Sequence, residues 1–344
     1  MGKLIVRIAS LLLIAAFLPT AVLAAEWNLE NGSIEITATA NAGGGTTQTV
    51  SQGGSSAEDS NPTITSNGKQ TSNTITIKAE KDTTANVTIK DTNIRTDSAA
   101  IKTEGEGNVN LNVEGTNTVS SGDKHAGVEK SNGGKLTIGS ESGEGKLTAN
   151  GGHGGAGIGG GYEGSGSDIT ITGGEITANG GGEAAGIGGG VLGSGSDITI
   201  TGGKVTATGG NGAAGIGGGN YKDGNDINIA GGKVTATGGD YGAGIGGGNQ
   251  GNGKNITITG GEVTAAGGTN GAGIGGGLRK EGEKITVSGD ATLKVQGGLT
   301  DEWDGAGAGI GNGGRHNGDT GSFIPVNGAE TEPDTSNLTT GKIE

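Results

Sequence analysis

Three aspartates recur at one spacing of 29 residues: Asp168, Asp197 and Asp226. If each repeat forms one layer of stacked β-strands, their carboxylates lie about 5 Å apart, and such a row of oxygen ligands suits Ca²⁺. At that separation like charges repel by about 1 kcal/mol in water. The other interpretation is conformational, because an aspartate side chain stabilises turns by bonding to its own backbone. The next two repeats carry Asn255 and Lys284 at this position, and we favour the turn interpretation.

Tyrosines and threonines are the side chains that could contact carbohydrate. Tyr162, Tyr221 and Tyr241 lie in glycine-rich loops, where the apolar face of a ring could stack on a sugar. Threonines recur at the 29-residue spacing, and a flat grid of hydroxyls suits a polysaccharide or, less well, ice. Their β-propensity on a solvated face is the simpler explanation. The two rows are Thr170, Thr199, Thr257 and Thr286, and Thr177, Thr206, Thr235 and Thr264.

The residues that acid–base catalysis requires do not cluster in this sequence. Arg95, Arg279 and Arg315 fall in different repeats, and the chain has no cysteine. Of the histidines, only His125 and His153 fall near one another by register, which is more typical of a solvated surface than of a metal site. The G-x-G strings open no helix, as a dinucleotide site requires. The sequence therefore predicts that the protein is not an enzyme.

A constant period identifies the elements that would position these residues. One series of residues lies in A-G-I-G-G-G motifs, a second in I-T-I-T-like segments and a third in K-V-T-A-T-G-G-like segments. Each series advances by 29 residues without insertion, which indicates a solenoid. The series are Ile158, Ile187, Ile216, Ile245 and Ile274; Ile169, Ile198, Ile227, Ile256 and Ile285; and Leu147, Ile176, Val205, Val234 and Val263.

Within each unit, apolar and polar residues alternate with period two, which indicates β-strands with one buried face. Glycine pairs follow two of the strands and a longer loop, 162–167, follows the third. We therefore predict an all-β fold, a parallel β-helix (solenoid) of about eight coils. The rule for parallel crossovers gives general support to a right-handed parallel β-helix. A polyproline II bundle is less suitable, because it needs glycine at every third position.

The ends of the chain differ from the repeats. Residues 1–24 resemble a signal peptide, with Lys3 and Arg7 before an apolar run, 8–18, that is short for a membrane span. We predict an N-terminal cap and irregular coil over 25–84, the β-helix over 85–315, and a C-terminal cap and polar tail over 316–344. Trp303, Phe323 and Ile324 would cover the end of the stack, and the polar tail from residue 330 would be disordered or a linker.

Composition and charge restrict the partners. The 83 glycines would suggest disorder if they were not periodic. Without its signal peptide the chain has 20 basic and 36 acidic residues, a net charge of −16. Such a chain repels phosphate backbones, so we expect no nucleic acid partner. We expect a secreted or cell-surface protein with no membrane span after signal cleavage and no disulfide.

Several motifs resemble those of one family. W-N-L-E-N-G-S-I-E-I-T-A (27–38), G-T-N-T-V (115–119), H-A-G-V-E (125–129) and the two glycine-rich repeats are similar to those of secreted Gram-positive bacterial carbohydrate-binding-domain proteins. The resemblance implies a right-handed β-helix that binds acidic, pectin-like plant polysaccharide with Ca²⁺ and without catalysis. Its repeats are specific for architecture and weak for activity. We therefore expect a non-catalytic extracellular carbohydrate-binding or adhesion module. The alternatives are a structural surface stalk without a small ligand and an ice-binding surface.

Overall fold

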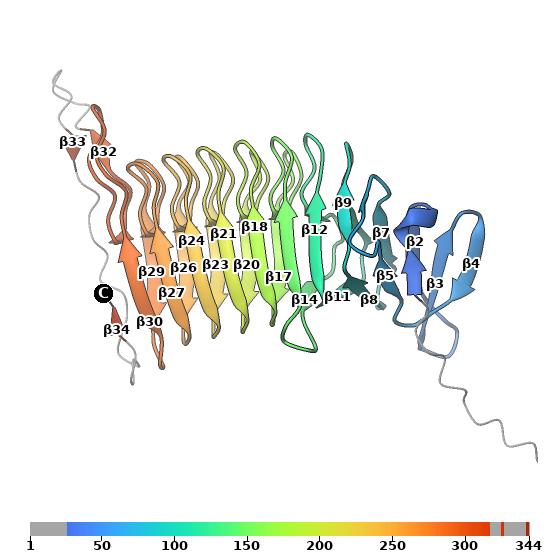
Figure 1. Cartoon of the computed structure of the whole chain (residues 1–344). Helices are drawn as coiled ribbons and strands as arrows, with labels where there is room; N and C mark the ends of the chain where they lie inside the picture. Colours follow the sequence, from blue (N-terminus) through green and yellow to red (C-terminus); the bar gives the residue numbers. More distant parts are fainter. Residues whose placement is uncertain (1–25, 317–324, 327–341, 344) are drawn as a thin grey trace, which may run out of the picture.

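The computed structural model describes residues 26–316, 325–326 and 342–343, which form a β-solenoid (Figure 1). The predicted signal peptide, Phe323 and Ile324 lie outside these residues. In the described part the only helix is a 3₁₀ turn, η1 (Leu29–Asn31). None of the described segments is a helix long and apolar enough to cross a membrane.

The solenoid wall consists of three sheets, which we name A, B and C. Sheet A contains β1 (Glu26–Asn28), β5 (Thr63–Thr65), β8 (Thr84–Lys90), β11 (Asn108–Glu114), β14 (Leu136–Gly139), β17 (Gly166–Ile171), β20 (Gly195–Ile200), β23 (Gly224–Ile229), β26 (Gly253–Ile258) and β29 (Gly282–Val287). Sheet B contains β2 (Ile34–Ala40), β3 (Thr46–Gln52), β4 (Ser55–Glu58), β7 (Ile75–Ala79), β10 (Ile101–Gly105), β13 (Val128–Lys130), β16 (Ile158–Gly159), β19 (Ile187–Gly188), β22 (Ile216–Gly217), β25 (Ile245–Gly246), β28 (Ile274–Gly275) and β31 (Ile310–Gly311).

Sheet C contains β6 (Gln70–Thr71), β9 (Asn93–Arg95), β12 (Thr116–Ser120), β15 (Lys146–Asn150), β18 (Glu175–Asn179), β21 (Lys204–Thr208), β24 (Lys233–Thr237), β27 (Glu262–Ala266), β30 (Thr292–Gln296) and β34 (Lys342–Ile343). β32 (Arg315–His316) and β33 (Pro325–Val326) form a separate antiparallel pair.

Each coil runs through one strand of sheet A, one of sheet C and one of sheet B. We number the coils 1 to 8, from β8–β9–β10 as coil 1 to β29–β30–β31 as coil 8. The prediction of an all-β parallel solenoid of about eight coils is therefore confirmed. The strands β5, β6 and β7 form one further coil before coil 1. The handedness stays a prediction.

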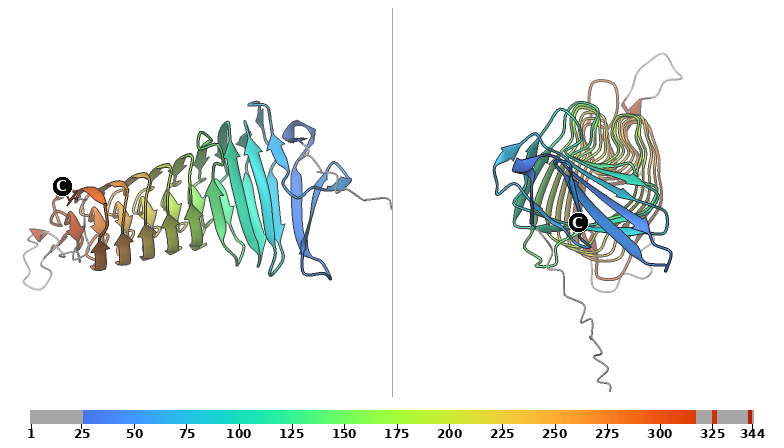
Figure 2. Two further views of the ribbon diagram at one scale, coloured as in Figure 1. Left: turned by 90° about the horizontal axis from the view of Figure 1, so that it is seen from below. Right: turned by 90° about the vertical axis from the view of Figure 1, so that its right-hand side faces the viewer.

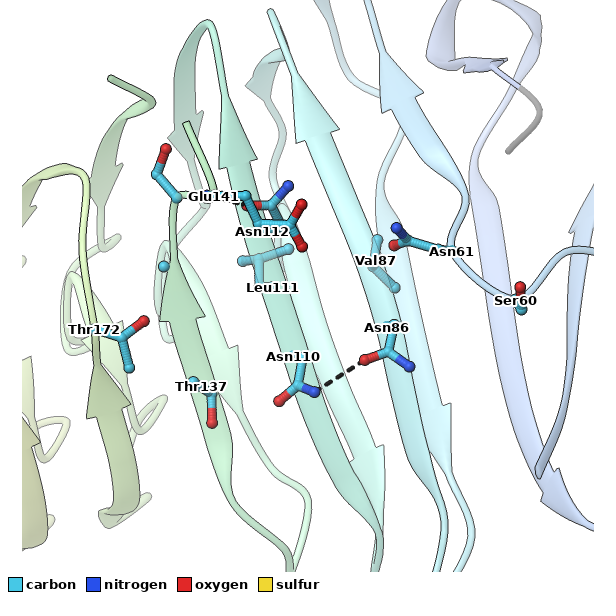
Figure 3. A pocket seen from close by; sticks show the side chains of 12 residues that line it. Ser60, Asn61, Asn86, Val87, Asn110, Leu111, Asn112, Thr137, Glu141 and Thr172 are labelled. Carbon is cyan, nitrogen blue, oxygen red and sulfur yellow. Dashed lines mark hydrogen bonds between the residues drawn. The ribbon is translucent and has the colours of Figure 1, made fainter. Parts of the chain in front are cut away.

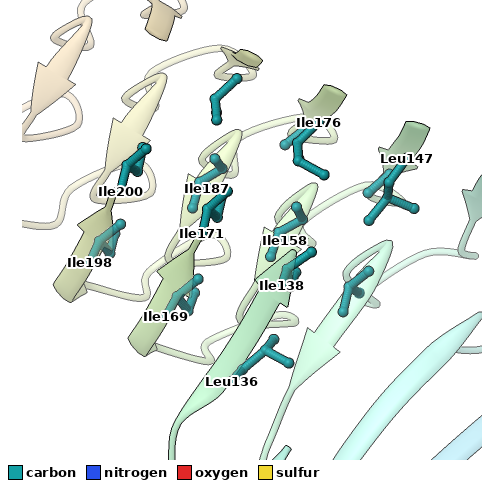
Figure 4. Close-up of a cluster of buried hydrophobic side chains, with 14 of the residues drawn as sticks. Leu136, Ile138, Leu147, Ile158, Ile169, Ile171, Ile176, Ile187, Ile198 and Ile200 are labelled. Carbon is teal, nitrogen blue, oxygen red and sulfur yellow. The ribbon is translucent and has the colours of Figure 1, made fainter. Parts of the chain in front are cut away.

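The predicted 29-residue register is the register of the sheets. In sheet B, Ile216 pairs with Ile187 on one side and Ile245 on the other, and all three are fully buried. Equivalent aliphatic side chains of sheets A and C also stack between coils and fill the interior (Figure 4). Because one coil buries only a few such side chains, its stability depends on its neighbours.

The strands of sheet B shorten along the stack, from five residues in β10 to two in β16 and its successors. Each two-residue strand ends at a glycine whose φ lies in the range that favours glycine, as at Gly217 (φ +132°). The chain then curls back, so that the Ala214 amide donates to the Gly218 carbonyl oxygen at 2.9 Å. This tight curl gives the serpentine outline in the end-on view (Figure 2).

A hairpin covers the N-terminal end of the stack. β3 pairs antiparallel with β2 and β4, whereas β2 also pairs parallel with β7. The buried amide of Gln48 in β3 donates to the backbone carbonyls of Asp59 and Asn86, both at 2.9 Å. The bond to Asn86 joins the hairpin to β8, the strand of sheet A in coil 1.

At the C-terminal end one expectation is wrong, and the structure describes a small part of the predicted tail. Trp303 is 57% exposed, so it does not act as the buried cover of the last coil. Of the predicted tail after residue 330, the structure describes Lys342–Ile343, which pair in parallel with Thr292–Leu293 of β30. The last strand of sheet C is thus supplied by the end of the chain.

Candidate functional site

The predicted aspartate row lies inside the strands of sheet A. Asp168, Asp197 and Asp226 belong to β17, β20 and β23, with φ angles of 54°, 52° and 53°. The ladder register omits them, since Ser167 pairs with Ser196 and the next pair is Ile169 with Ile198. Aspartate and asparagine tolerate this left-handed conformation better than most residues do. The recurrence of aspartate at this position is therefore explained by the positive φ angle that each strand requires there.

The contacts of the row do not assemble a metal cage. Asn255 donates from Nδ2 to Asp226 Oδ1 at 3.0 Å, so the row continues as an amide-to-carboxylate bond. Within the described ranges, no three or more His, Cys, Asp or Glu side chains lie close enough together to hold a metal ion. Ca²⁺ binding by Asp168, Asp197 and Asp226 stays a prediction.

The three candidate tyrosines lie in three different loops. Tyr162 lies between β16 and β17, Tyr221 between β22 and β23, and Tyr241 between β24 and β25. Tyr162 and Tyr221 are exposed and Tyr241 is half-buried. Because their spacings of 59 and 20 residues are not multiples of 29, they do not form one stack in the way that the core isoleucines do.

The predicted threonine rows are present on the outer faces. In sheet C, Thr177, Thr206, Thr235 and Thr264 pair in sequence between neighbouring coils. In sheet A, Asn228 occupies the gap in the row between Thr199 and Thr257. Beside the sheet C row, Glu175 accepts from Lys146 and Lys204 at 2.9 and 2.7 Å, and these bonds lower the pKa of Glu175 to about 2. This face therefore carries charges of both signs.

A groove that the sequence does not predict crosses the outer face of sheet A in coils 1 to 3. We call it the asparagine groove; its volume is about 550 Å³ (Figure 3). Amides, hydroxyls and one carboxylate line it. The residues with side chains in its wall are Ser60, Asn61, Asn86, Asn110, Asn112, Thr137, Ser140, Glu141 and Thr172.

Hydrogen bonds hold the amides of this groove in place. Asn110 donates from Nδ2 to Asn86 Oδ1 at 2.9 Å, and both side chains are exposed. Asn112 accepts from the Glu141 amide at 2.9 Å and donates to Thr88 Oγ1 at 3.3 Å, which ties the loop after β14 to the sheet. The groove thus has a fixed wall and two amides that face solvent.

A second cleft lies between coil 2 and the loop that joins coils 3 and 4. We call it the lysine cleft; its volume is about 590 Å³, and its lining includes Lys124, His125, Glu129, Lys130 and Tyr162. Glu129 pairs with Gly159, the first glycine of the regular curl, so this coil carries charged side chains where later coils carry glycine. The cleft is therefore a feature of one coil and not of the repeat.

Its charged groups have defined partners. His125 Nδ1 lies 2.8 Å from Glu129 Oε2, and the Ala126 amide donates to the same oxygen at 3.3 Å. Lys130 is buried and donates from Nζ to the Asn132 carbonyl oxygen at 2.7 Å. Burial lowers the pKa of Lys130, and the negative charge of Asp168 partly opposes this shift.

Sequence comparison identifies the repeat. A family model described as a beta helix repeat matches five segments, and no curated protein and no solved structure matches the chain. The matched segments are 142–162, 169–191, 198–220, 227–249 and 256–278.

Proposed function

Since the chain is a β-helix repeat protein, we propose that it acts outside the cell as a surface or adhesin-like module that binds carbohydrate without catalysis. The observation that carries this proposal is the asparagine groove, in which a fixed polar wall presents the amides of Asn86 and Asn110 to solvent. A carbohydrate offers many hydroxyls, each a donor and an acceptor. An amide side chain also offers both functions.

The length of the groove also supports an extended ligand. Its lining comes from three neighbouring strands of sheet A, β8, β11 and β14, together with Thr172 directly after β17 and the segment before β5. Strands in a sheet are about 4.8 Å apart, so the lined surface extends over more than about 15 Å. An oligosaccharide of several units fits this surface better than a single small molecule does.

Replacing both Asn86 and Asn110 with Ala should weaken binding of the preferred oligosaccharide by about tenfold or more, because each amide contributes hydrogen bonds to the ligand. The ligand is first found by screening the protein on a glycan array. Affinity is then measured by calorimetry for the wild type and the double variant.

The control for this experiment is Asn150→Ala with Asn179→Ala. These residues form an equivalent outward pair on sheet C, with Asn179 Nδ2 donating to Asn150 Oδ1 at 2.8 Å. The control variant should bind as the wild type does. Absence of binding to every glycan would contradict the proposed function and favour the structural stalk.

We also propose that a bridging cation at the aspartate row strengthens the binding of an acidic polysaccharide, because the chain itself is strongly acidic and the cation would offset the repulsion between the two. Chelator should then weaken the retention of the protein on polygalacturonate. Changing Asp168, Asp197 and Asp226 together to Asn should do the same while keeping residues that tolerate a positive φ.

The matched control neutralises three exposed acids outside the row, Glu58, Glu106 and Glu144, by changing each to Gln. Retention in the presence of Ca²⁺ is compared for the wild type and both triple variants. Equal retention with Ca²⁺ and with chelator would eliminate the row as a cation site and leave its conformational role.

A further inference from the structure

We propose that the lysine cleft binds the carboxylate of an acidic sugar directly, between Lys124 and Lys130, without a metal ion. The inference deepens the proposed function and rests on it for the sugar. The anion site itself follows from the contacts in the cleft.

The buried ammonium of Lys130 is the first of these contacts. The residue is 6% exposed, yet its side chain lines an open cleft. Its Nζ donates to the carbonyl oxygen of Asn132, which is a neutral acceptor and does not balance the positive charge. A buried charge is costly unless an opposite charge compensates it. An incoming carboxylate would provide that compensation.

The carboxylate in the lining of the cleft, Glu129, is bound to groups other than the lysines. Glu129 Oε2 accepts from the Ala126 amide at 3.3 Å and lies 2.8 Å from His125 Nδ1. Both partners belong to the turn directly before β13, so they hold the Glu129 carboxylate close to the backbone of coil 2. Asp168 is the other acid that influences Lys130, through its charge and not through a bond that the structure records. The lining therefore offers two lysines against one engaged carboxylate.

Tyr162 positions the second lysine. Lys124 Nζ lies 5.5 Å from the centroid of the Tyr162 ring, within the range of a cation–π contact. The Tyr162 amide also donates to the Lys124 carbonyl oxygen at 2.8 Å, so backbone and ring both join this loop to coil 2. Tyr162 was predicted to stack on a sugar. In this arrangement its ring holds an ammonium group at the cleft, and Tyr162 is a positioning residue for Lys124.

The test measures binding of trigalacturonate and of the neutral galactotriose by calorimetry, both in the presence of chelator. We expect the wild type to bind trigalacturonate, and Lys124→Gln with Lys130→Gln to weaken this binding by about tenfold or more. The control variant Lys222→Gln with Lys280→Gln removes the same charge from two lysines outside the cleft, in the loops that join sheet B to sheet A after β22 and after β28. It should change the affinity by less than about twofold.

A second measurement separates the cleft from the asparagine groove. In the protein with ¹³C-methylated lysines, galacturonate should shift the signals of Lys124 and Lys130, and methyl galactoside should not. Tyr162→Leu should reduce the Lys124 shift, whereas Tyr162→Phe should keep it. If Lys130→Gln lowers the melting temperature, the exposed Lys124→Gln variant and these lysine signals still decide the result.

The outcomes distinguish the two proposals. Unshifted lysine signals, or equal weakening by both double variants, would overturn the lysine cleft as an anion site. Binding of galactotriose with unshifted lysines would retain the proposed function and reject this inference. Shifted lysine signals without binding to any oligosaccharide would retain the anion site and reject the carbohydrate-binding function.

Discussion

Replacing Ile216 with Asp is expected to destabilise the protein by about 4 kcal/mol or more and to lower its melting temperature accordingly. Ile216 is fully buried between Ile187 and Ile245, where a carboxylate would find only aliphatic side chains within the stack. The loss should spread beyond one coil, because each coil is stabilised mainly by its two neighbours. Chemical and thermal unfolding followed by circular dichroism measure both effects.

The control for this substitution is Thr206→Asp on the outer face of sheet C, where the same carboxylate remains in contact with solvent. This variant should lose no more than about 1 kcal/mol, as is typical of surface positions. If both variants unfolded at the same temperature, Ile216 could not belong to a buried stack and the assignment of the coils would be wrong.

Replacing Gly217 with Ala is expected to destabilise the protein by several kcal/mol, although it adds only a methyl group. The φ angle of +132° is one that residues with a Cβ rarely adopt. A Cβ at this position would also overlap the carbonyl oxygen of Gly246 in the next coil, which is backbone and cannot move alone. The free energy of unfolding of the variant, measured by urea denaturation, tests this.

Gly173→Ala is the matched control. Its added Cβ would lie 3.7 Å from the nearest atoms, those of the Ser140 backbone, and its φ is not in the left-handed range. This variant should be as stable as the wild type or slightly more stable, because alanine restricts the unfolded chain. A stable Gly217→Ala variant would show that the curl of sheet B relaxes more easily than its close packing indicates.

The sequence was sufficient to predict the core because the core depends on the most regular residues. Isoleucines spaced by 29 residues, such as Ile158 and Ile187, can stack only if each unit forms one coil. Alternation with period two then defines which residues face inward. The same regularity placed the threonine rows correctly, since side-chain direction follows directly from strand register.

The asparagine groove could not be predicted in this way. Asn86, Asn110 and Thr137 lie on neighbouring strands but are 24 and 27 residues apart. No constant period aligns them, and an isolated asparagine in a polar sequence gives no sign that it faces a groove. The hydrogen bond between Asn86 and Asn110 depends on coil lengths that the folded chain alone defines.

The lysine cleft left a partial signal in the sequence. His125 and Glu129 lie four residues apart in the H-A-G-V-E motif, whereas the repeat register relates His125 only to His153. The structure pairs His125 with Glu129. The burial of Lys130 had no signal, because a lysine among polar residues normally predicts an exposed surface. The 29-residue spacing predicts the aspartate row, but it does not predict the left-handed backbone of these residues inside their strands.

The near identity of coils 4 to 7 has a consequence for the folding reaction. Val205 stacks on Ile176 and under Val234, so a shift of this strand by one whole repeat would place almost the same side chains in contact. Local packing energy therefore distinguishes poorly between the correct pairing and a slipped one. The irregular coils contain contacts that occur once, such as the bonds of buried Asn117 to Thr92 and Lys146. Because these contacts can form in only one pairing, they fix the register of the irregular coils. The regular coils that stack on them then adopt the correct register.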